Sequence, residues 1–285
     1  MIPTESGEIQ SVAIIPAFNE EGTVGGVVRA ALRAKRVGAV VMVNDGSADE
    51  TSKVAYQAAE LEITSLTKPF IVADHTTNQG KAEAMQTGFA YAEWLGDGAL
   101  KTVVFLDADP SPISSRATYN RKLGTRIANG ASGGIIDRPD EFINLFAGYL
   151  DELIRPVSED EKIMTIGLLQ RNWMVDALRL RLNWGALAGN RAVNAELWRS
   201  MLSDYQQRGL EITGWQTEAA LNTYTRKNRD NNGTKLNRHI GKLLMPGIVN
   251  VGSRVKAGGF ISGLARMASI NGQALGGFAK YGLRS

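Results

Sequence analysis

From residue 11 to residue 107, short apolar runs alternate with longer amphipathic segments, and this alternation restricts the fold of the 285-residue chain most strongly. The runs have the length of β-strands and the longer segments the length of helices. Alternating strands and helices form βαβ units, which build a parallel sheet with helices on both faces. We therefore predict an α/β fold with strands at 11–16, 39–44, 70–73 and 102–107 and helices at 20–36, 48–61 and 80–94.

Beyond residue 109 the alternation becomes less regular. We expect a helix at 112–129, a glycine-rich strand at 131–137, two or three helices within 140–183, a short strand or loop at 187–190, and helices at 196–202 and 216–225. The organisation predicted is two halves of one domain, 1–113 and 114–250, the second more helical than the first, followed by a basic, glycine-containing tail at 251–285.

Composition excludes several classes of protein. The chain has no cysteine, so it has no disulfide and no thiolate metal site. Its amino-terminus lacks the basic start and apolar stretch of a secretory signal, and no apolar run approaches the ~20 residues that span a bilayer. We therefore expect a cytoplasmic protein without a membrane-spanning helix.

The small net charge of +3 conceals an uneven distribution. Residues 231–285 contain eight Lys or Arg and no acidic residue, so residues 1–230 carry a net charge of −5. Such a basic segment suits an anionic lipid surface or a phosphorylated substrate, although a solvated basic surface is an equally good interpretation. The segment predicts peripheral contact with the inner face of the membrane.

Two aspartates follow the fourth predicted strand. Side chains two residues apart on an extended chain point the same way, so Asp107 and Asp109 are expected to project together. Neighbouring carboxylates repel unless a cation or proton intervenes, and Mg²⁺ or Mn²⁺ with oxygen ligands supplies that charge. The simpler alternative is a strand-end turn in which Asp107 caps a helix.

Polar residues also follow the second and third strands. Asp45 can accept hydrogen bonds from a base N–H or from ribose hydroxyls, but it also suits an Asp-Gly turn that caps a helix. Gly80 allows close backbone approach, and Lys81 can meet a diphosphate or remain solvated. In a parallel sheet these loops meet at the carboxyl ends of the strands, where ligands bind.

Taken together, these motifs resemble a known family. In the order IPAFNEEGTV, VNDGSADET, NQGKAEAM and VVFLDADPSPI, they are similar to the nucleotide-sugar-binding half of GT-A glycosyltransferases of the family 2 type. LAGNRAV at 187–193 and GWQTE at 214–218 are similar to acceptor-side segments of polyprenyl-phosphate sugar transferases and glucosyl-3-phosphoglycerate synthases. The resemblance implies a Rossmann-like GT-A fold with a mostly parallel central sheet and a more helical acceptor-side half.

For the donor nucleotide, the resemblance implies a pocket lined by Pro16, Phe18 and Glu20, with Asp45 holding the base. Asn44 stands where relatives usually carry another acid, so the resemblance does not decide between UDP- and GDP-sugars. The residues that follow Asp109 also differ from those of the mannosyl-phosphate-dolichol enzymes, so the identity of the sugar does not transfer.

For the metal, the resemblance implies that Asp109 is a ligand, that Asp107 faces ribose, diphosphate and metal, and that His239 completes the site. A surface histidine in a basic strand is the alternative for His239. The ion, Mg²⁺ or Mn²⁺, together with Lys81 or Arg191, stabilises the charge on the leaving diphosphate.

On the acceptor side, the resemblance implies roles for Gly189 and Arg191. An alcohol acceptor must lose a proton as it attacks, and Glu218 is the candidate general base. A phosphate monoester is largely ionised at pH 7 and needs only cations to position it.

These observations predict an enzyme, a metal-dependent hexosyltransferase that uses a nucleoside diphosphate sugar. A polyprenyl (lipid) phosphate is the first choice of acceptor, and a soluble phosphorylated acceptor such as phosphoglycerate is the main alternative. A non-catalytic nucleotide-binding module is the second alternative. We expect no nucleic-acid partner and allow for a homodimer, while the sequence leaves open whether the sugar is inverted or retained.

Overall fold

The computed structural model describes residues 8–63, 68–112, 139–169, 188–214 and 216–250, with 272–273, 276–277 and 279–281 near the C-terminus. Among these residues, no helix combines the length and apolar character needed to cross a bilayer.

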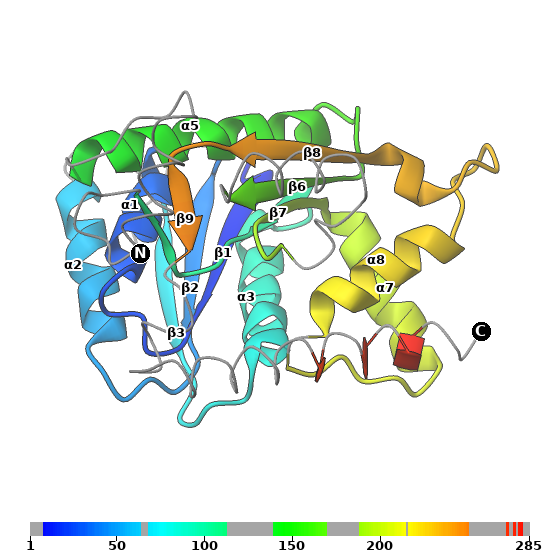
Figure 1. The fold of residues 1–285 in the computed structure, drawn as a ribbon, viewed down its shortest axis with the longest axis horizontal. Helices are drawn as coiled ribbons and strands as arrows, with labels where there is room; N and C mark the ends of the chain where they lie inside the picture. Colours follow the sequence, from blue (N-terminus) through cyan, green and yellow to red (C-terminus); the bar gives the residue numbers. More distant parts are fainter. Residues whose placement is uncertain are drawn as a thin grey trace, which may run out of the picture.

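A seven-stranded sheet runs through the molecule in the order β3-β2-β1-β4-β7-β6-β8 (Figure 1). Its strands are β1 (Ser11–Ala17), β2 (Ala39–Asn44), β3 (Phe70–Asp74), β4 (Thr102–Phe105), β6 (Met164–Leu169), β7 (Arg191–Asn194) and β8 (Ile240–Met245). All pairings are parallel except those of β7, which is antiparallel to both β4 and β6. Because β7 is reversed, it begins at the edge where β4 ends, and Arg191 pairs with Phe105.

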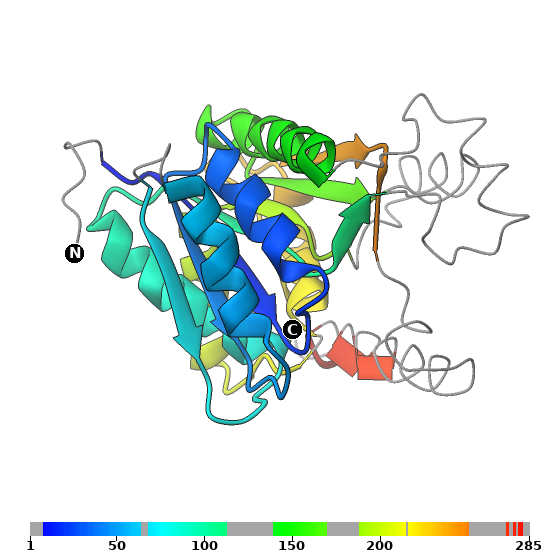
Figure 2. The same cartoon turned by 90° about the vertical axis from the view of Figure 1, so that its left-hand side faces the viewer.

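Helices cover both faces of this sheet (Figure 2). One face packs against α1 (Val24–Arg33), α2 (Thr51–Ile63) and α5 (Pro139–Ser158). The other packs against α3 (Lys81–Gly96), α7 (Ala195–Gln207) and α8 (Thr217–Lys227). The predicted α/β architecture with a mostly parallel, helix-flanked sheet is confirmed.

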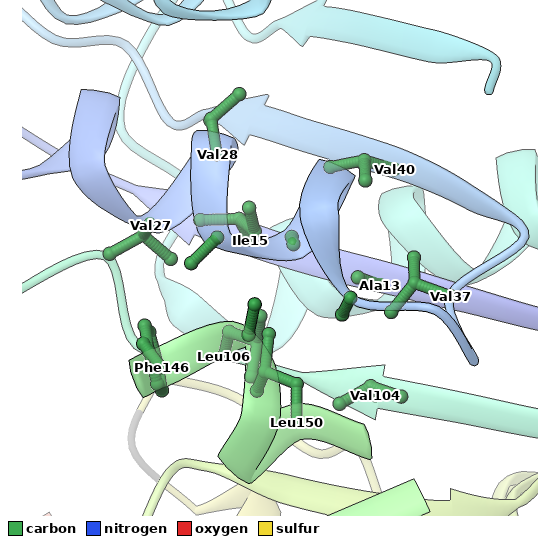
Figure 3. Close-up of a cluster of buried hydrophobic side chains, with 14 of the residues drawn as sticks. Ala13, Ile15, Val27, Val28, Val37, Val40, Val104, Leu106, Phe146 and Leu150 are labelled. Carbon is green, nitrogen blue, oxygen red and sulfur yellow. The ribbon is translucent and has the colours of Figure 1, made fainter. Parts of the chain in front are cut away.

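An aliphatic core fixes the strands that lead into the polar loops. Ile15 of β1 and Leu106, directly after β4, pack with Val27 of α1 and with Phe146 and Leu150 of α5 (Figure 3). All five side chains are at most 1% exposed. Burying a side chain of this size contributes roughly 1.5–3 kcal/mol, so the core holds the ends of β1 and β4 in register.

A second, two-stranded sheet joins distant parts of the chain. β5 (Pro110–Pro112), directly after Asp109, pairs antiparallel with β9 (Ile248–Asn250). A short 3₁₀ helix, η2 (Leu236–His239), precedes β8.

The predicted strands and helices up to residue 96 are confirmed, with ends that differ by a few residues, and β4 stops at Phe105 instead of residue 107. The prediction of two or three helices within 140–183 was wrong at Met164–Leu169, which is a buried strand paired on both sides, with β7 and β8. A short continuous apolar run fits a buried strand and a buried helix equally well, so periodicity could not separate them. The elements predicted at 112–129 and 131–137 lie outside the described residues, apart from Pro112 at the end of β5.

Part of the predicted tail packs against the folded domain. Tyr281 is only 2% exposed and stacks on Tyr205 of α7 with ring centroids 4.8 Å apart. Its hydroxyl lies 3.0 Å from the carbonyl oxygen of Glu211 and 2.9 Å from the side-chain oxygen of Gln216. The Lys227 ammonium donates to the Tyr281 carbonyl (2.9 Å). At this residue, therefore, the C-terminal segment belongs to the core.

Candidate active site

The loops after β1 and β2 are joined to each other by hydrogen bonds. The Asn19 N–H donates to Ser47 Oγ (2.9 Å), and the Ala48 N–H donates to Asn19 Oδ1 (2.9 Å). The Glu20 N–H donates to Thr51 Oγ1 (2.8 Å) at the start of α2. These bonds tie the two loops into one unit at the carboxyl edge of the sheet.

All three residues predicted to line the nucleoside pocket lie at this edge, at the end of β1 or just beyond it. Pro16 and Glu20 are partly buried, whereas the Phe18 ring is 40% exposed. An exposed aromatic ring next to hydrogen-bonding loops is suited to stacking against a nucleobase.

Asp45 anchors the loop that leads into α3. Its two carboxylate oxygens accept hydrogen bonds from the backbone N–H groups of Gln79 (2.9 Å) and Gly80 (2.8 Å). The His75 ring lies 2.8 Å from Asp45 Oδ1 through Nδ1 and 3.0 Å from Thr87 Oγ1 through Nε2. Asp45 is 3% exposed, so its first function is to fix the loop at 75–80.

Gly80 and Lys81 begin α3 under tight backbone restraint. Gly80 has a φ of 97°, which disfavours side chains larger than hydrogen, and a Cβ there would lie 3.4 Å from Gly214. One residue into the helix, the Ala82 N–H donates to the Gly214 carbonyl (3.1 Å). The start of α3 is thus held against the segment that leads into α8.

Lys81 joins two distant carboxylates. Its Nζ donates to Asp107 Oδ1 at 2.9 Å and to Glu218 Oε1 at 2.6 Å. The three side chains are 10%, 17% and 5% exposed, so the pairs are largely shielded from water. Burial alone lowers the pKa of Lys81, but the two carboxylates outweigh it and raise the pKa well above the ordinary value. Lys81 therefore carries a stable positive charge.

The segment before β7 closes over Asp107. The Asp107 N–H donates to Asn190 Oδ1 (3.2 Å), and a Cβ placed on Gly189 would lie 2.0 Å from Asp107 Oδ1. Glycine at 189 thus allows the chain to pass directly over the carboxylate. Gly189 was predicted on the acceptor side, and the structure places it in backbone contact with the candidate donor site.

Arg191 is buried near Asp107 and Glu218 rather than exposed on the surface. The residue is 1% exposed, and its guanidinium donates to the Ala188 carbonyl (2.7 Å) and to Asn222 Oδ1 (3.1 Å). Burial lowers the pKa of Arg191 to about 10, while the negative charges of Glu218 and Asp107 oppose this shift. Arg191 is therefore placed to act on these carboxylates by its electric field rather than to touch an acceptor.

Asp109 lies two residues after Asp107 in the loop between β4 and β5, and it is partly exposed. Mg²⁺ and Mn²⁺ prefer oxygen ligands, and a cation that also binds substrate phosphates takes only one or two carboxylates from the protein. The described residues contain no group of three or more His, Asp or Glu arranged to hold a metal. Asp107 and Asp109 remain the candidate carboxylates for such a cation.

The structure does not bring His239 to these carboxylates. His239 directly precedes β8, whose first residue, Ile240, pairs with Met164 at the start of β6. Both strands run parallel to β4, so His239 lies at the edge where they begin, whereas Asp107 follows the end of β4. The His239 ring is instead 3.1 Å from Asp230. His239 therefore takes no part in the candidate site.

Several residues that support the site did not stand out in the sequence. Asn190 and Asn222 are buried partners of Asp107 and Arg191, and Gly214 holds the start of α3. Their partners are far away in the chain, so no local signal marked them. His75 lies outside the motifs that carry the family resemblance, and its contacts with Asp45 and Thr87 give it a structural role.

Comparisons with known proteins agree with this fold. Residues 12–113 match the model of glycosyl transferase family 2. No curated protein sequence matches the chain significantly. Among solved structures, glucosyl-3-phosphoglycerate synthase from Mycobacterium tuberculosis is similar in complexes with Mn²⁺, UDP-glucose and phosphoglyceric acid (TM-score 0.60), with Mn²⁺, UDP-glucose and glycerol 3-phosphate (0.60), and with Mg²⁺ and UDP (0.59). Each alignment has 15% identity and covers 95% of this chain and 79% of that enzyme.

The sequence-based resemblance is thereby confirmed. The segment that carries the polar loops after β1, β2, β3 and β4 is the segment that the family model matches. The structural likeness extends over nearly the whole chain and establishes the fold of both halves.

Proposed function

We propose that this glycosyltransferase of the GT-A, family 2 type moves a hexosyl group from a UDP-sugar to a phosphorylated acceptor, assisted by a divalent cation. The observation that carries the proposal is the buried contact of Lys81 with Asp107 and Glu218, which joins the family-matched half to the second half. A degenerate binding module has no need for such a costly arrangement of charges, because buried ions require desolvation.

In this proposal the loops after β1 and β2 bind the nucleoside. Phe18 offers its exposed ring to the base, and the joined loops offer polar groups to the ribose. Asp45 fixes the loop at 75–80. Its carboxylate already takes part in three hydrogen bonds, so it can accept a hydrogen bond from the base only with its remaining oxygen lone pairs. UDP is preferred because UDP and UDP-glucose are bound in the structurally similar enzyme.

Lys81 stabilises the diphosphate as the glycosidic bond breaks. Its ammonium is held by Glu218, remains charged, and lies beside Asp107 at the carboxyl edge. In such a site the largest contribution to catalysis usually comes from a fixed cation that stabilises the negative charge developing in the transition state. Asp109, with Asp107 beside it, would hold Mg²⁺ or Mn²⁺, which supplies further charge stabilisation to the leaving group.

Glu218 has two candidate roles that depend on the acceptor. It is 4% exposed and bonded to Lys81, which makes it the residue that orients the lysine. With an alcohol acceptor, its second carboxylate oxygen would serve as general base. With an ionised phosphate acceptor no base is required, and orientation of Lys81 is sufficient.

The acceptor is proposed to be a phosphate monoester. In the structurally similar enzyme the bound acceptor-side molecules are phosphoglyceric acid and glycerol 3-phosphate, which are soluble. A lipid phosphate is supported separately by the eight basic residues at 231–285. Peripheral membrane contact belongs to that second acceptor. Both acceptors offer a phosphate group for cations to bind, but the soluble ones also carry a hydroxyl that can attack the sugar, whereas a polyprenyl phosphate attacks through a phosphate oxygen.

The proposal is tested by product formation. The 285-residue chain is incubated with UDP-glucose or GDP-glucose, Mn²⁺, and either 3-phosphoglycerate, glycerol 3-phosphate or polyprenyl phosphate in vesicles, and released nucleotide and glycosylated product are measured. We expect acceptor-dependent release of UDP that chelation abolishes. Nucleotide binding without release of UDP for any acceptor class would indicate a non-catalytic module.

A test of vesicle binding requires variants that keep the contacts of Tyr281 with the folded domain. Deleting 254–285 also removes Tyr281 from the core, so loss of binding would be ambiguous. Replacing Arg254, Lys256 and Arg266 by Gln lowers the charge while leaving Tyr281 in place. If the lipid acceptor is correct, these variants bind anionic vesicles more weakly and keep activity on soluble acceptors.

A further inference from the structure

The buried cluster formed by Lys81, Asp107, Arg191 and Glu218 is electrically balanced. Its four side chains carry two positive and two negative charges, and all are largely or fully buried. Lys81 bonds to both carboxylates, while Glu218 and Asp107 act electrostatically on Arg191. Charges removed from water are stable only when they are compensated, so the balance is a requirement of burial.

One member of this cluster is also a proposed neighbour of the cation. Asp107 Oδ1 lies 2.9 Å from Lys81 Nζ, so an ammonium occupies that side of the carboxylate. Asp109, two residues further along the chain, is partly exposed in the loop between β4 and β5. A divalent ion that approached Asp107 alone would meet Lys81 at close range, and repulsion at such distances in a shielded site is strong.

A nucleoside diphosphate changes this balance. It brings several negative charges to the same edge, and these compensate both the divalent ion and the Lys81 ammonium. Lys81 can then donate to a phosphate oxygen while it keeps its bond to Glu218, and Asp107 becomes available. We infer that Lys81 acts as a placeholder cation: its ammonium holds Asp107 until the donor arrives and thereby makes metal binding depend on the nucleotide. This inference rests on the proposed function.

The inference is tested on donor-free protein, where activity plays no part. Mn²⁺ affinity is measured by calorimetry, first alone and then with saturating UDP, for the wild type, K81M, E218Q and the double variant K81M/E218Q. The double variant has the same net charge as the wild type, so it separates loss of the placeholder from a change in local charge. K101M removes an exposed lysine that precedes β4 and serves as the matched control.

We expect the wild type and K101M to bind Mn²⁺ weakly alone and at least tenfold more tightly with UDP. K81M and the double variant should bind Mn²⁺ alone at least tenfold more tightly than the wild type, while E218Q should not. By linkage, the same coupling should appear when UDP is titrated with and without Mn²⁺. A cooperative thermal unfolding transition for each variant shows that the variant is folded before its affinity is compared with that of the wild type.

Two results overturn the inference while leaving the proposed function intact. One is a wild type that binds Mn²⁺ equally well with and without UDP. The other is a tightening in K81M that disappears in the double variant, which would assign the effect to net charge alone. If no protein binds Mn²⁺ even with UDP, the metal-dependent function itself fails.

Discussion

The donor-side loops and the buried charge cluster lie at the same edge of the sheet but are held together differently. The loops are fixed by hydrogen bonds between nearby segments, such as Asn19 to Ser47 and Gly80 to Asp45, which are 28 and 35 residues apart. The cluster depends on Lys81 and Glu218, which are 137 residues apart. Damage to a donor-side loop should therefore stay local, whereas damage to the cluster removes a contact between parts of the chain that are otherwise joined through the β4–β7 pairing.

The strongest test of this difference is Lys81→Met. It leaves Asp107 and Glu218 without their shared cation, and breaking a buried pair from one side costs about 3–5 kcal/mol. Loss of a positioned cation should also lower kcat/KM by roughly 100- to 1,000-fold. Urea unfolding and initial rates measure the two effects, with Lys101→Met as the exposed control. A kcat/KM within threefold of the wild type would remove Lys81 from the mechanism.

Gly189→Ala should have the next largest effect. The added methyl would lie 2.0 Å from Asp107 Oδ1, so the segment before β7 must shift, at a cost of roughly 1–3 kcal/mol. Activity should fall with stability because Asp107 moves. Gly148→Ala in α5 is the matched control: no atom lies within 4 Å of its Cβ, and alanine should stabilise this helix by about 0.5–1 kcal/mol. Equal stability of the two variants would contradict the close contact.

Tyr281→Phe sharpens the comparison at the C-terminal end. The variant keeps the ring stacked on Tyr205 but loses the hydroxyl next to Glu211 and Gln216, which should cost about 1 kcal/mol. Gln216 precedes α8, so some loss of kcat through Glu218 is also expected. Tyr91→Phe, at an exposed position on α3, should leave unfolding unchanged. The denaturation midpoints of the two variants measure the difference.

His239→Ala should have the smallest effect. His239 is bonded to Asp230 at the other edge of the sheet, so Mn²⁺-dependent activity should remain within twofold of the wild type. A metal ligand in this position would instead produce a large loss that excess Mn²⁺ partly restores. Metal titration of the initial rate distinguishes these results and checks the placement of β8.

Much of the donor side could be predicted because its signals are local. Apolar runs ended by polar residues marked β1 to β4, and the order of strands and helices required their carboxyl ends to meet at one edge. Asp45, Lys81 and Asp107 were therefore expected together, and the structure places them there. It also shows that the Asp45 carboxylate is engaged by the loop at 75–80.

The acceptor side was predicted less well because its contacts join distant segments. Met164–Leu169 was interpreted as part of a helical region, Arg191 as an acceptor-side residue, and His239 as a metal ligand or a surface histidine, whereas Met164–Leu169 is a strand, Arg191 is buried and His239 contacts Asp230. In each case the deciding fact is a strand pairing: β7 is reversed between β4 and β6, and β8 is added at the far edge. No motif encodes such pairings.

The sequence by itself determined the α/β class, the family resemblance and the carboxyl edge at which the candidate site lies, because hydrophobic period and loop chemistry act over a few residues. Only the tertiary structure decided that Lys81 bridges Asp107 and Glu218, that Arg191 is buried, and that Tyr281 returns to the core. Charge pairing and burial depend on which distant surfaces pack together, and packing is a property of the whole folded chain.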